Sequence, residues 1–500
     1  MNASHNLQIG WASVDLTPNE PVQLSGQFHV RVSEGVLDHV TATALALSTD
    51  DGEESGSAVM VSCDFVTIPD SLRDAVRERV RRAVPELDPM AVFLNATHTH
   101  TGPEVRVDRD FDLLGGGISS TGIDIELPGM APSAYVDFAV DRIAATVERA
   151  WRSREPGTLA YGLGHAVVGR NRRSVYEGGI SRMYGDTGLP EFLHIEGYED
   201  HDVNLLATWN VGGNLTGLVV NVACPSQVSE QLFEISADYW HDTRRELRRR
   251  FGDDVFVLPQ CSAAGDQSPH IQVGEALEER MWCLAGRTER QEIAARIADA
   301  VGAVLPLIEK EPMSDPALKH HIEEVHLARR RLSQADVDEA VQEAEQLRAE
   351  YEERRQELEA NPELQQQPRW YVRLTYCYRR MKWWEGVIRR FELEKTNPRF
   401  PMELHVLRLG DVVLATNAFE YYLDFGVRIK ARSAAMQTFL VQLAGPGTYV
   451  PTERAVAGKS YGAIPASTPV GPEGGRELVE YTLSAIDRLF GAPDSNEGRG

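Results

Sequence analysis

The chain has 500 residues, and its 75 acidic against 51 basic side chains give a formal net charge of −24. Nucleic-acid phosphates and anionic bilayers repel such a charge, so we expect neither nucleic acid nor a membrane among its partners. The length allows one large domain with an insertion, or two domains.

The N-terminus and the cysteines bear on the cellular compartment. Residues 1–6 show no basic segment leading into an apolar one, as a secretory signal would. No apolar run approaches the roughly 20 residues that span a bilayer. The five cysteines are odd in number and scattered, a pattern typical of reduced thiols: Cys63, Cys224, Cys261, Cys283 and Cys377. We therefore expect a cytoplasmic protein.

The first 300 residues alternate between short apolar runs and amphipathic, arginine-rich segments. The apolar runs predict buried strands at 58–63, 91–94, 215–222 and 255–258. The amphipathic segments predict helices at 71–83, 134–152, 238–251 and 289–307. This order is typical of an α/β fold, with a multilayer mixed β-sheet core flanked by helices. In such folds ligands gather at the carboxyl ends of strands.

Residues 331–394 differ in character and predict a helical hairpin inserted into the α/β domain. Apolar residues recur at helical spacing after Ser333, a plausible N-cap, and Asn361-Pro362 interrupts the pattern. The second arm is rich in Tyr, Trp and Arg. It can serve as a lid on the active site, as a contact in a homo-oligomer, or as simple packing on the parent domain.

The strand pattern returns after Pro401. An alternating run at 403–409, a Gly-Asp turn and an apolar run at 412–416 predict a β-hairpin, and a last helix is expected at about 476–489. We expect residues 1–330 and 395–490 to form the catalytic domain, and residues 491–500 to form a disordered tail.

The triplet His98-Thr99-His100 is the first candidate for chemistry. It follows an apolar strand and precedes the turn at Gly102-Pro103. Residues two apart in an extended chain project to the same side, so both imidazoles can bind one metal. Equally, one can bind a metal while the other transfers protons. The alternative is a pair of surface histidines at the end of a strand.

Around this triplet, the segment Asn95-Ala96-Thr97-His98-Thr99-His100-Thr101-Gly102-Pro103 resembles the histidine motif of the neutral/alkaline ceramidases, zinc amidases that remove the acyl chain of ceramide. Further segments resemble that family in the same order. They begin near Ile9, Val61, Gly169, Ile235, Gly265, Asn417 and Thr448. The similarity spans roughly residues 8 to 465, interrupted by the helical insertion.

The resemblance implies roles for several residues. His98, Glu420 and Tyr449 would bind a divalent metal, zinc by preference, and His100 would be a catalytic acid–base or supporting residue. Such a metal makes bound water acidic enough to attack a carbonyl near neutral pH. Tyr461 would donate a hydrogen bond to the developing oxyanion. Without the resemblance, the sequence favours interpreting Glu420 as an ordinary surface acid and Tyr449 as a packed aromatic residue.

One expected ligand is missing. Where the family carries a second histidine ligand, this chain has Ala223-Cys224-Pro225. Cys224 can supply a thiolate, Gln227 a weaker oxygen ligand, and His241 can reach in from the next helix. Alternatively, the metal is held less tightly or is absent, and Cys224 is a small buried side chain.

The substrate is expected to differ from ceramide. The chain is acidic and shows neither a signal peptide nor the C-terminal immunoglobulin-like domain that the family usually carries. We therefore expect a small, soluble, polar substrate, with amide cleavage as the default reaction. Beside a catalytic Asp266, the residues expected to orient the substrate are Asp64, Arg170, Asn171, Gln227, Asp238 and Gln267.

Two alternatives stay open. An altered metal shell, or two carboxylates about 5–10 Å apart, can serve glycoside or ester hydrolysis. Candidates for that pair are Asp64, Asp238, Asp266 and Glu420. The chain can also be a non-catalytic binding or assembly protein that has lost the metal.

Overall fold

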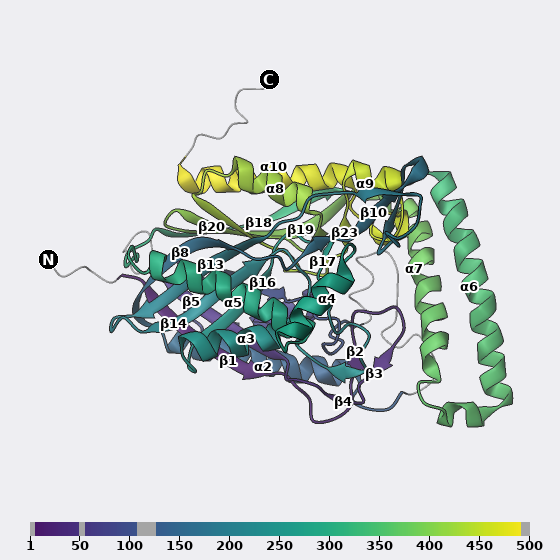
Figure 1. Ribbon diagram of the computed structural model, residues 1–500, viewed down its shortest axis with the longest axis horizontal. Helices are drawn as coiled ribbons and strands as arrows, with labels where there is room; N and C mark the ends of the chain where they lie inside the picture. The colour runs from purple at the N-terminus through teal and green to yellow at the C-terminus, as the bar shows by residue number, and fades with distance from the viewer. Residues whose placement is uncertain (1–5, 50–55, 108–126, 492–500) are drawn as a thin grey trace, which may run out of the picture.

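The computed structural model describes residues 6–49, 56–107 and 127–491. They form four layers, in which two β-sheets pack face to face between two layers of helices (Figure 1). The order of the larger, eight-stranded sheet is β16-β14-β13-β8-β1-β5-β6-β7, and that of the four-stranded sheet is β18-β19-β20-β22. This arrangement confirms the predicted α/β class with a multilayer mixed sheet core.

The strands of the larger sheet are β1 (Gln8–Asp15), β5 (Thr41–Ser48), β6 (Ser57–Cys63), β7 (Val92–Ala96), β8 (Glu155–His165), β13 (Asp202–Asn210), β14 (Leu215–Val222) and β16 (Phe256–Cys261). Those of the smaller sheet are β18 (Leu318–Ala328), β19 (Arg399–Leu409), β20 (Val412–Thr416) and β22 (Gln437–Val441). A separate three-stranded sheet consists of β10 (Arg173–Tyr176), β11 (Ile180–Met183) and β12 (Phe192–Ile195).

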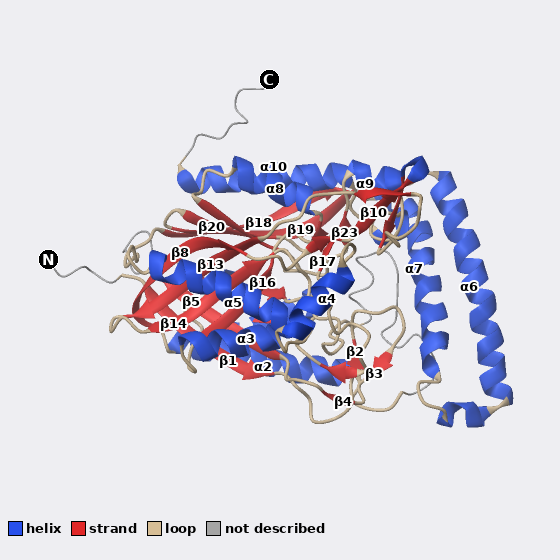
Figure 2. Ribbon diagram, viewed as in Figure 1, coloured by secondary structure: helices blue, strands red, loops and turns tan. Residues whose placement is uncertain are grey.

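The helices cover the outer faces of both sheets (Figure 2). The larger sheet packs against α1 (Asp70–Ala83), α2 (Pro132–Arg152), α3 (Tyr239–Phe251) and α5 (Glu289–Ile308). The smaller sheet packs against α8 (Leu423–Arg432) and α10 (Pro472–Phe490). Two further short helices are α4 (Glu275–Leu284) and α9 (Glu453–Gly458). No helix among the described residues is long and apolar enough to cross a membrane.

The alternation of side chains in β5 explains how one strand serves two cores. Ala42, Ala44 and Ala46 face α1 and α2, whereas Leu45 and Leu47 face the smaller sheet. Since successive side chains of a strand point to opposite faces, small residues meet the helices and leucines fill the space between the sheets.

The predicted strands and helices of the first 300 residues are confirmed within about two residues at most ends, as are the β-hairpin of β19 and β20 and the final helix. The elements that were not predicted include the strands β5, β8 and β13 of the larger sheet, the helix α4 and the strands β10 to β12. The helix α4 buries none of its residues, so its sequence carries no amphipathic pattern. The strands β10 to β12 are only four residues long, and β11 and β12 are largely exposed or half-buried. The expected tail, apart from Gly491, lies outside the described residues.

The predicted helical hairpin is present as α6 (Gln334–Ala360) and α7 (Tyr371–Thr396). Ser333 caps α6 as expected, accepting a hydrogen bond from the backbone of Asp336. The hairpin lies along one side of the sheet layers, with α7 on the inner side (Figure 1). Tyr371 and Thr375 of α7 accept hydrogen bonds from the backbone of Val32 and Val30. Its standing as a separate domain remains a prediction.

A buried ion pair ties the loop after β6 to α3. Both Asp64 oxygens accept hydrogen bonds from Arg244 at 2.9 Å, and Asp64 also binds Thr41 and Thr97. The Asp64 side chain is fully buried. Such a pair stabilises little relative to an apolar core, but loss of one partner leaves a buried charge uncompensated.

We therefore expect Arg244→Ala to lower the free energy of unfolding by about 3–5 kcal/mol, measured by urea denaturation. The matched control is Arg152→Ala, which removes an exposed pair with Glu148 and should leave the urea midpoint almost unchanged. Equal, small shifts in both variants would contradict a structural role for the buried pair.

Candidate active site

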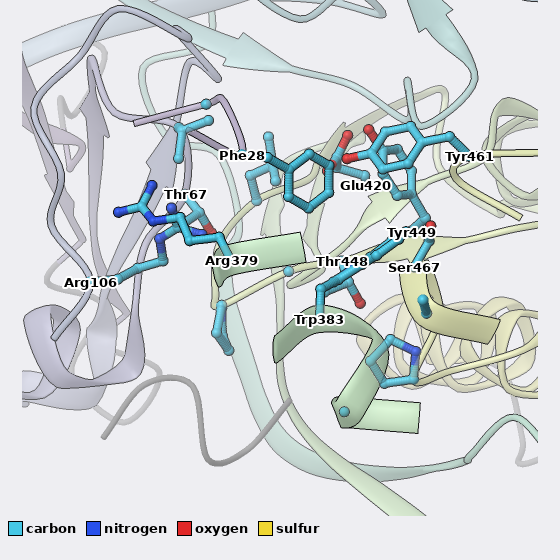
Figure 3. A pocket seen from close by; sticks show the side chains of 18 of the residues that line it. Phe28, Thr67, Arg106, Arg379, Trp383, Glu420, Thr448, Tyr449, Tyr461 and Ser467 are labelled. Atoms are coloured by element: carbon cyan, nitrogen blue, oxygen red, sulfur yellow. The ribbon is translucent and has the colours of Figure 1, made fainter. Parts of the chain in front are cut away.

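A cavity of about 210 Å³ opens between the sheet layers and α7. Figure 3 shows two ends: Arg106, Thr67 and Arg379 lie toward one side, and Glu420, Tyr449 and Tyr461 toward the other. His98 and His100 also line it. Residues expected from the sequence to carry the chemistry therefore lie together, although loops far apart in the chain supply them.

Backbone pairing brings these loops together. The backbone NH of His100, in the loop after β7, donates to Ser226 in the loop after β14. Ala96 at the end of β7 donates to Leu443, just after β22. The two-residue strands β21 (Glu420–Tyr421) and β23 (Tyr449–Val450) run parallel, with Glu420 opposite Tyr449. This register places the carboxylate and the phenol side by side.

The two histidines face each other. The Nδ1 of His98 donates to the carbonyl oxygen of Val66 at 2.6 Å, and its Nε2 lies 3.2 Å from the Nε2 of His100. The Nδ1 of His100 lies 3.1 Å from a Glu230 oxygen, outside the alignment of a regular hydrogen bond. The backbone of His98 has a φ of 60°, which residues other than glycine rarely adopt. Such strain is often found at functional sites.

Glu420 is the one acidic side chain among the described residues that line the cavity. Its Oε2 lies 3.5 Å from the Nε2 of His98 and 3.6 Å from a guanidinium nitrogen of Arg172. Burial acts to raise the pKa of Glu420, but His98 and Arg172 together hold it below its usual value. The carboxyl group is therefore ionised at neutral pH.

Arg172 supports the acidic end of the cavity from behind. Its guanidinium is buried and donates to the hydroxyls of Tyr449 at 3.2 Å and Tyr184 at 2.7 Å, and to the Gly265 carbonyl at 2.9 Å. Burial alone would lower the pKa of Arg172, yet the two tyrosines and Glu420 raise it well above the ordinary value. The charge of this arginine is thus fixed beside Glu420.

Tyr461 stands over this end of the cavity. Its ring lies 5.4 Å from that of Tyr449 and 6.0 Å from that of Trp383 on α7, measured between centroids. Burial, followed by the charge of Glu420, raises the pKa of Tyr461 to about 12. The phenol keeps its proton at neutral pH and can donate a hydrogen bond to a substrate oxygen.

The donor set suits a divalent cation, but it is not preassembled. Among the described residues, no group of three His, Cys, Asp or Glu side chains is close enough to hold a metal ion. Instead, His98 forms close pairs with His100 and with Glu420. Imidazole and carboxylate are ligands that zinc prefers, and the bonded Nδ1 of His98 leaves its Nε2 available.

The three residues considered as replacements for the missing histidine ligand do not line the described cavity. The Cys224 thiol is fully buried among core residues, and burial raises its pKa well above the ordinary value. The Gln227 oxygen accepts hydrogen bonds from Arg172 and Tyr184, so the amide turns its nitrogen to His100. His241 lies on α3, 3.9 Å from Asp38. None of the three is among the described residues that line the cavity.

Most of the polar residues expected to orient a substrate have structural partners instead, and none of them lines the described cavity. Asp64 pairs with Arg244, Arg170 pairs with Glu278, and Asp238 caps α3. Asn171 donates to Asp266, which also accepts from the backbone of Leu423, and Gln267 donates to the Tyr198 carbonyl. These placements provide no second carboxylate for glycosidase chemistry beside Glu420.

Three contributors were not recognised in the sequence. Glu230 lies in an irregular loop after β14, with no motif around it. Phe28, from the loop after β2 (Gln23–Leu24), and Trp383 of α7 form a wall, with ring centroids 5.2 Å apart. The aromatic character of the second hairpin arm was the available signal, but it could not distinguish a cavity wall from packing.

No family model matches the chain. A segment of 183 residues is 25% identical to the neutral ceramidase of Pseudomonas aeruginosa, covering 36% of this chain and 24% of that protein. The matched segment thus spans about a quarter of the curated relative.

The fold gives a wider match. The crystal structure of the Pseudomonas aeruginosa neutral ceramidase superposes with a TM-score of 0.66 at 18% identity, covering 98% of this chain and 75% of that chain. A structure described as a ceramidase complexed with C2 superposes with a TM-score of 0.64 at 15% identity, covering 99% and 77%. The chain is therefore a divergent protein with the neutral ceramidase fold, as the sequence resemblance predicted.

Proposed function

We propose that this protein is a hydrolase that cleaves an amide C–N bond with water activated by a divalent cation. The observation that carries this proposal is the convergence of His98, Glu420 and Tyr449 at one end of a cavity, beneath the protonated phenol of Tyr461. The relatives with this fold are named ceramidases, and a ceramidase cleaves the amide bond of ceramide.

A bound divalent cation would lower the pKa of a water molecule and polarise a carbonyl. His98, Glu420 and Tyr449 would hold the cation, and zinc suits this donor set. Tyr461 donates a hydrogen bond to the substrate oxygen as negative charge develops on it. Arg172 keeps Glu420 ionised and orients the Tyr449 hydroxyl.

The cavity supports a small substrate with one apolar and one polar part. Its volume of about 210 Å³ lies below the range of roughly 300–1,000 Å³ common for ligand pockets. Phe28, Trp383 and Tyr461 form an aromatic wall, while Thr67 and Arg106 lie toward the other end (Figure 3). A short N-acyl amide with a polar head fits this division better than a long-chain lipid.

A substrate panel tests the proposed reaction. Matched amides, esters and glycosides that share one short acyl or aglycone group are incubated with the protein, and product release is followed by chromatography. We expect amides to be cleaved, with activity lost after dialysis against a chelator and restored by Zn²⁺. Cleavage of glycosides or esters alone, or amide cleavage that survives metal removal, would contradict the proposal.

Tyr461→Phe tests the oxyanion donor. Removal of one such donor typically lowers kcat by about 10²–10³-fold, and we expect that loss with little change in KM. The control is Tyr198→Phe, because the Tyr198 side chain is 61% exposed and is not among the described residues lining the cavity. A Tyr461→Phe enzyme with wild-type kcat would exclude the proposed role.

Trp383→Ala tests the contribution of the hairpin to substrate binding. Removal of this aromatic surface should raise KM roughly tenfold for substrates with an apolar acyl group, and less for acetyl amides. The matched control is Trp370→Ala at the N-terminal end of the same helix, where the ring packs among residues outside the cavity. Equal KM changes in both variants would indicate general loosening of the hairpin.

A further inference from the structure

His100 faces His98 in an arrangement that two neutral histidines would not adopt on their own. The Val66 carbonyl can only accept a hydrogen bond, so the Nδ1 of His98 carries the hydrogen. When the ring is neutral, its Nε2 presents a lone pair toward the Nε2 of His100, 3.2 Å away. The tautomer of His100 decides whether this contact is attractive.

Gln227 and Glu230 fix that tautomer from two sides. Arg172 and Tyr184 donate to the Gln227 oxygen, so its amide nitrogen is the atom that faces the Nε2 of His100 at 2.9 Å. This nitrogen can only donate, which makes the Nε2 of His100 an acceptor. The Nδ1 of His100 in turn lies against the Glu230 carboxylate, at 3.1 Å. With both rings neutral, each Nε2 thus carries a lone pair toward the other.

Two lone pairs at this distance repel unless a metal ion or a shared proton lies between them. The distances fit a metal ion: zinc at bond lengths of about 2.0–2.2 Å in a tetrahedron places its ligand atoms roughly 3.3–3.6 Å apart. The His98–His100 and His98–Glu420 separations are 3.2 and 3.5 Å. His98 belongs to both pairs. A bound ion would draw His100 and Glu420 together and so complete a set of three ligands.

The surroundings of His100 resemble those of a metal-bound histidine. A carboxylate on the far nitrogen typically orients such a ring, and here the Glu230 carboxylate lies 3.1 Å from that nitrogen. His270 holds Glu230 in turn, at 3.2 Å. On the other face, a Cβ at Gly26 would lie 2.6 Å from the His100 ring, so the glycine allows the backbone to pack directly on the imidazole. The ring has little freedom to turn away.

We propose that His100 is a direct ligand of the cation, completing the set of His98, Glu420 and Tyr449, and that Glu230 orients it. His100 thereby replaces the histidine that is missing at Cys224. This inference rests on the proposed metal-dependent function. Gln227 donates to the same Nε2 and would release it when the cation binds.

Zn²⁺ titration of the metal-free full chain by calorimetry tests the inference without reference to activity. We expect one equivalent in the wild type, and affinity losses of more than about tenfold for His100→Ala and about 10–100-fold for Glu230→Gln. The controls Cys224→Ser and His241→Ala should bind as the wild type does. Wild-type affinity in a folded His100→Ala variant, as expected if the histidines share a proton instead, would overturn the inference.

Co²⁺-loaded wild-type protein provides a readout that needs no variant. We expect two paramagnetically shifted, exchangeable imidazole NH signals by NMR and no sulfur-to-cobalt charge-transfer absorption. One imidazole signal, or a thiolate band, would refute ligation by His100 in place of Cys224. Absence of any metal binding by the wild type would overturn the proposed function itself, a result distinct from unchanged binding in His100→Ala.

Discussion

The buried carboxylate of Glu420 is the group around which the polar side chains of the cavity are arranged. An ionised acid away from water is unfavourable unless cations and hydrogen-bond donors compensate it. Here the Arg172 guanidinium supplies a compensating positive charge, and the His98 imidazole and the Tyr449 phenol lie beside the carboxylate. The same charge raises the pKa of Tyr461 and so keeps that phenol a donor. One carboxylate thus organises both the proposed cation site and the proposed oxyanion site.

The inserted hairpin gives the cavity its second wall and links the fold to specificity. The helix α7 is held by hydrogen bonds from Val30 and Val32 at one point, and its Trp383 packs against Phe28 at another. The sheets and their loops supply Glu420 and its partners, whereas the insertion supplies Arg379 and Trp383 to the opposite wall of the cavity. A change in the hairpin can therefore alter the substrate without disturbing Glu420 and its partners.

The sequence predicted the elements with strong periodicity and the residues within ordered motifs. Four strands of the larger sheet and four helices up to residue 308 follow from apolar patterning, and His98, Glu420 and Tyr449 follow from the order of short motifs. The sequence was less informative about polar residues at strand ends. Asp64 and Asp238 look the same in sequence whether they bind a ligand, pair with an arginine or cap a helix. Their partners come from distant segments.

The same limit explains Cys224, Glu230 and Trp383. Whether Cys224 points into the cavity or into the core depends on the packing of Tyr239 and its neighbours on α3, which no local pattern encodes. Glu230 meets His100 across more than a hundred residues of chain. The aromatic residues of α7 indicated burial, but only the three-dimensional arrangement shows which of them face the cavity.

X-ray absorption at the zinc edge of the zinc-loaded protein tests the central claim most directly, because it reports the atoms bound to the ion. The account predicts a shell of nitrogen and oxygen atoms at about 2.0–2.2 Å, with outer-shell scattering from two imidazole rings. A sulfur atom at about 2.3 Å, or a protein that retains no zinc, would contradict it.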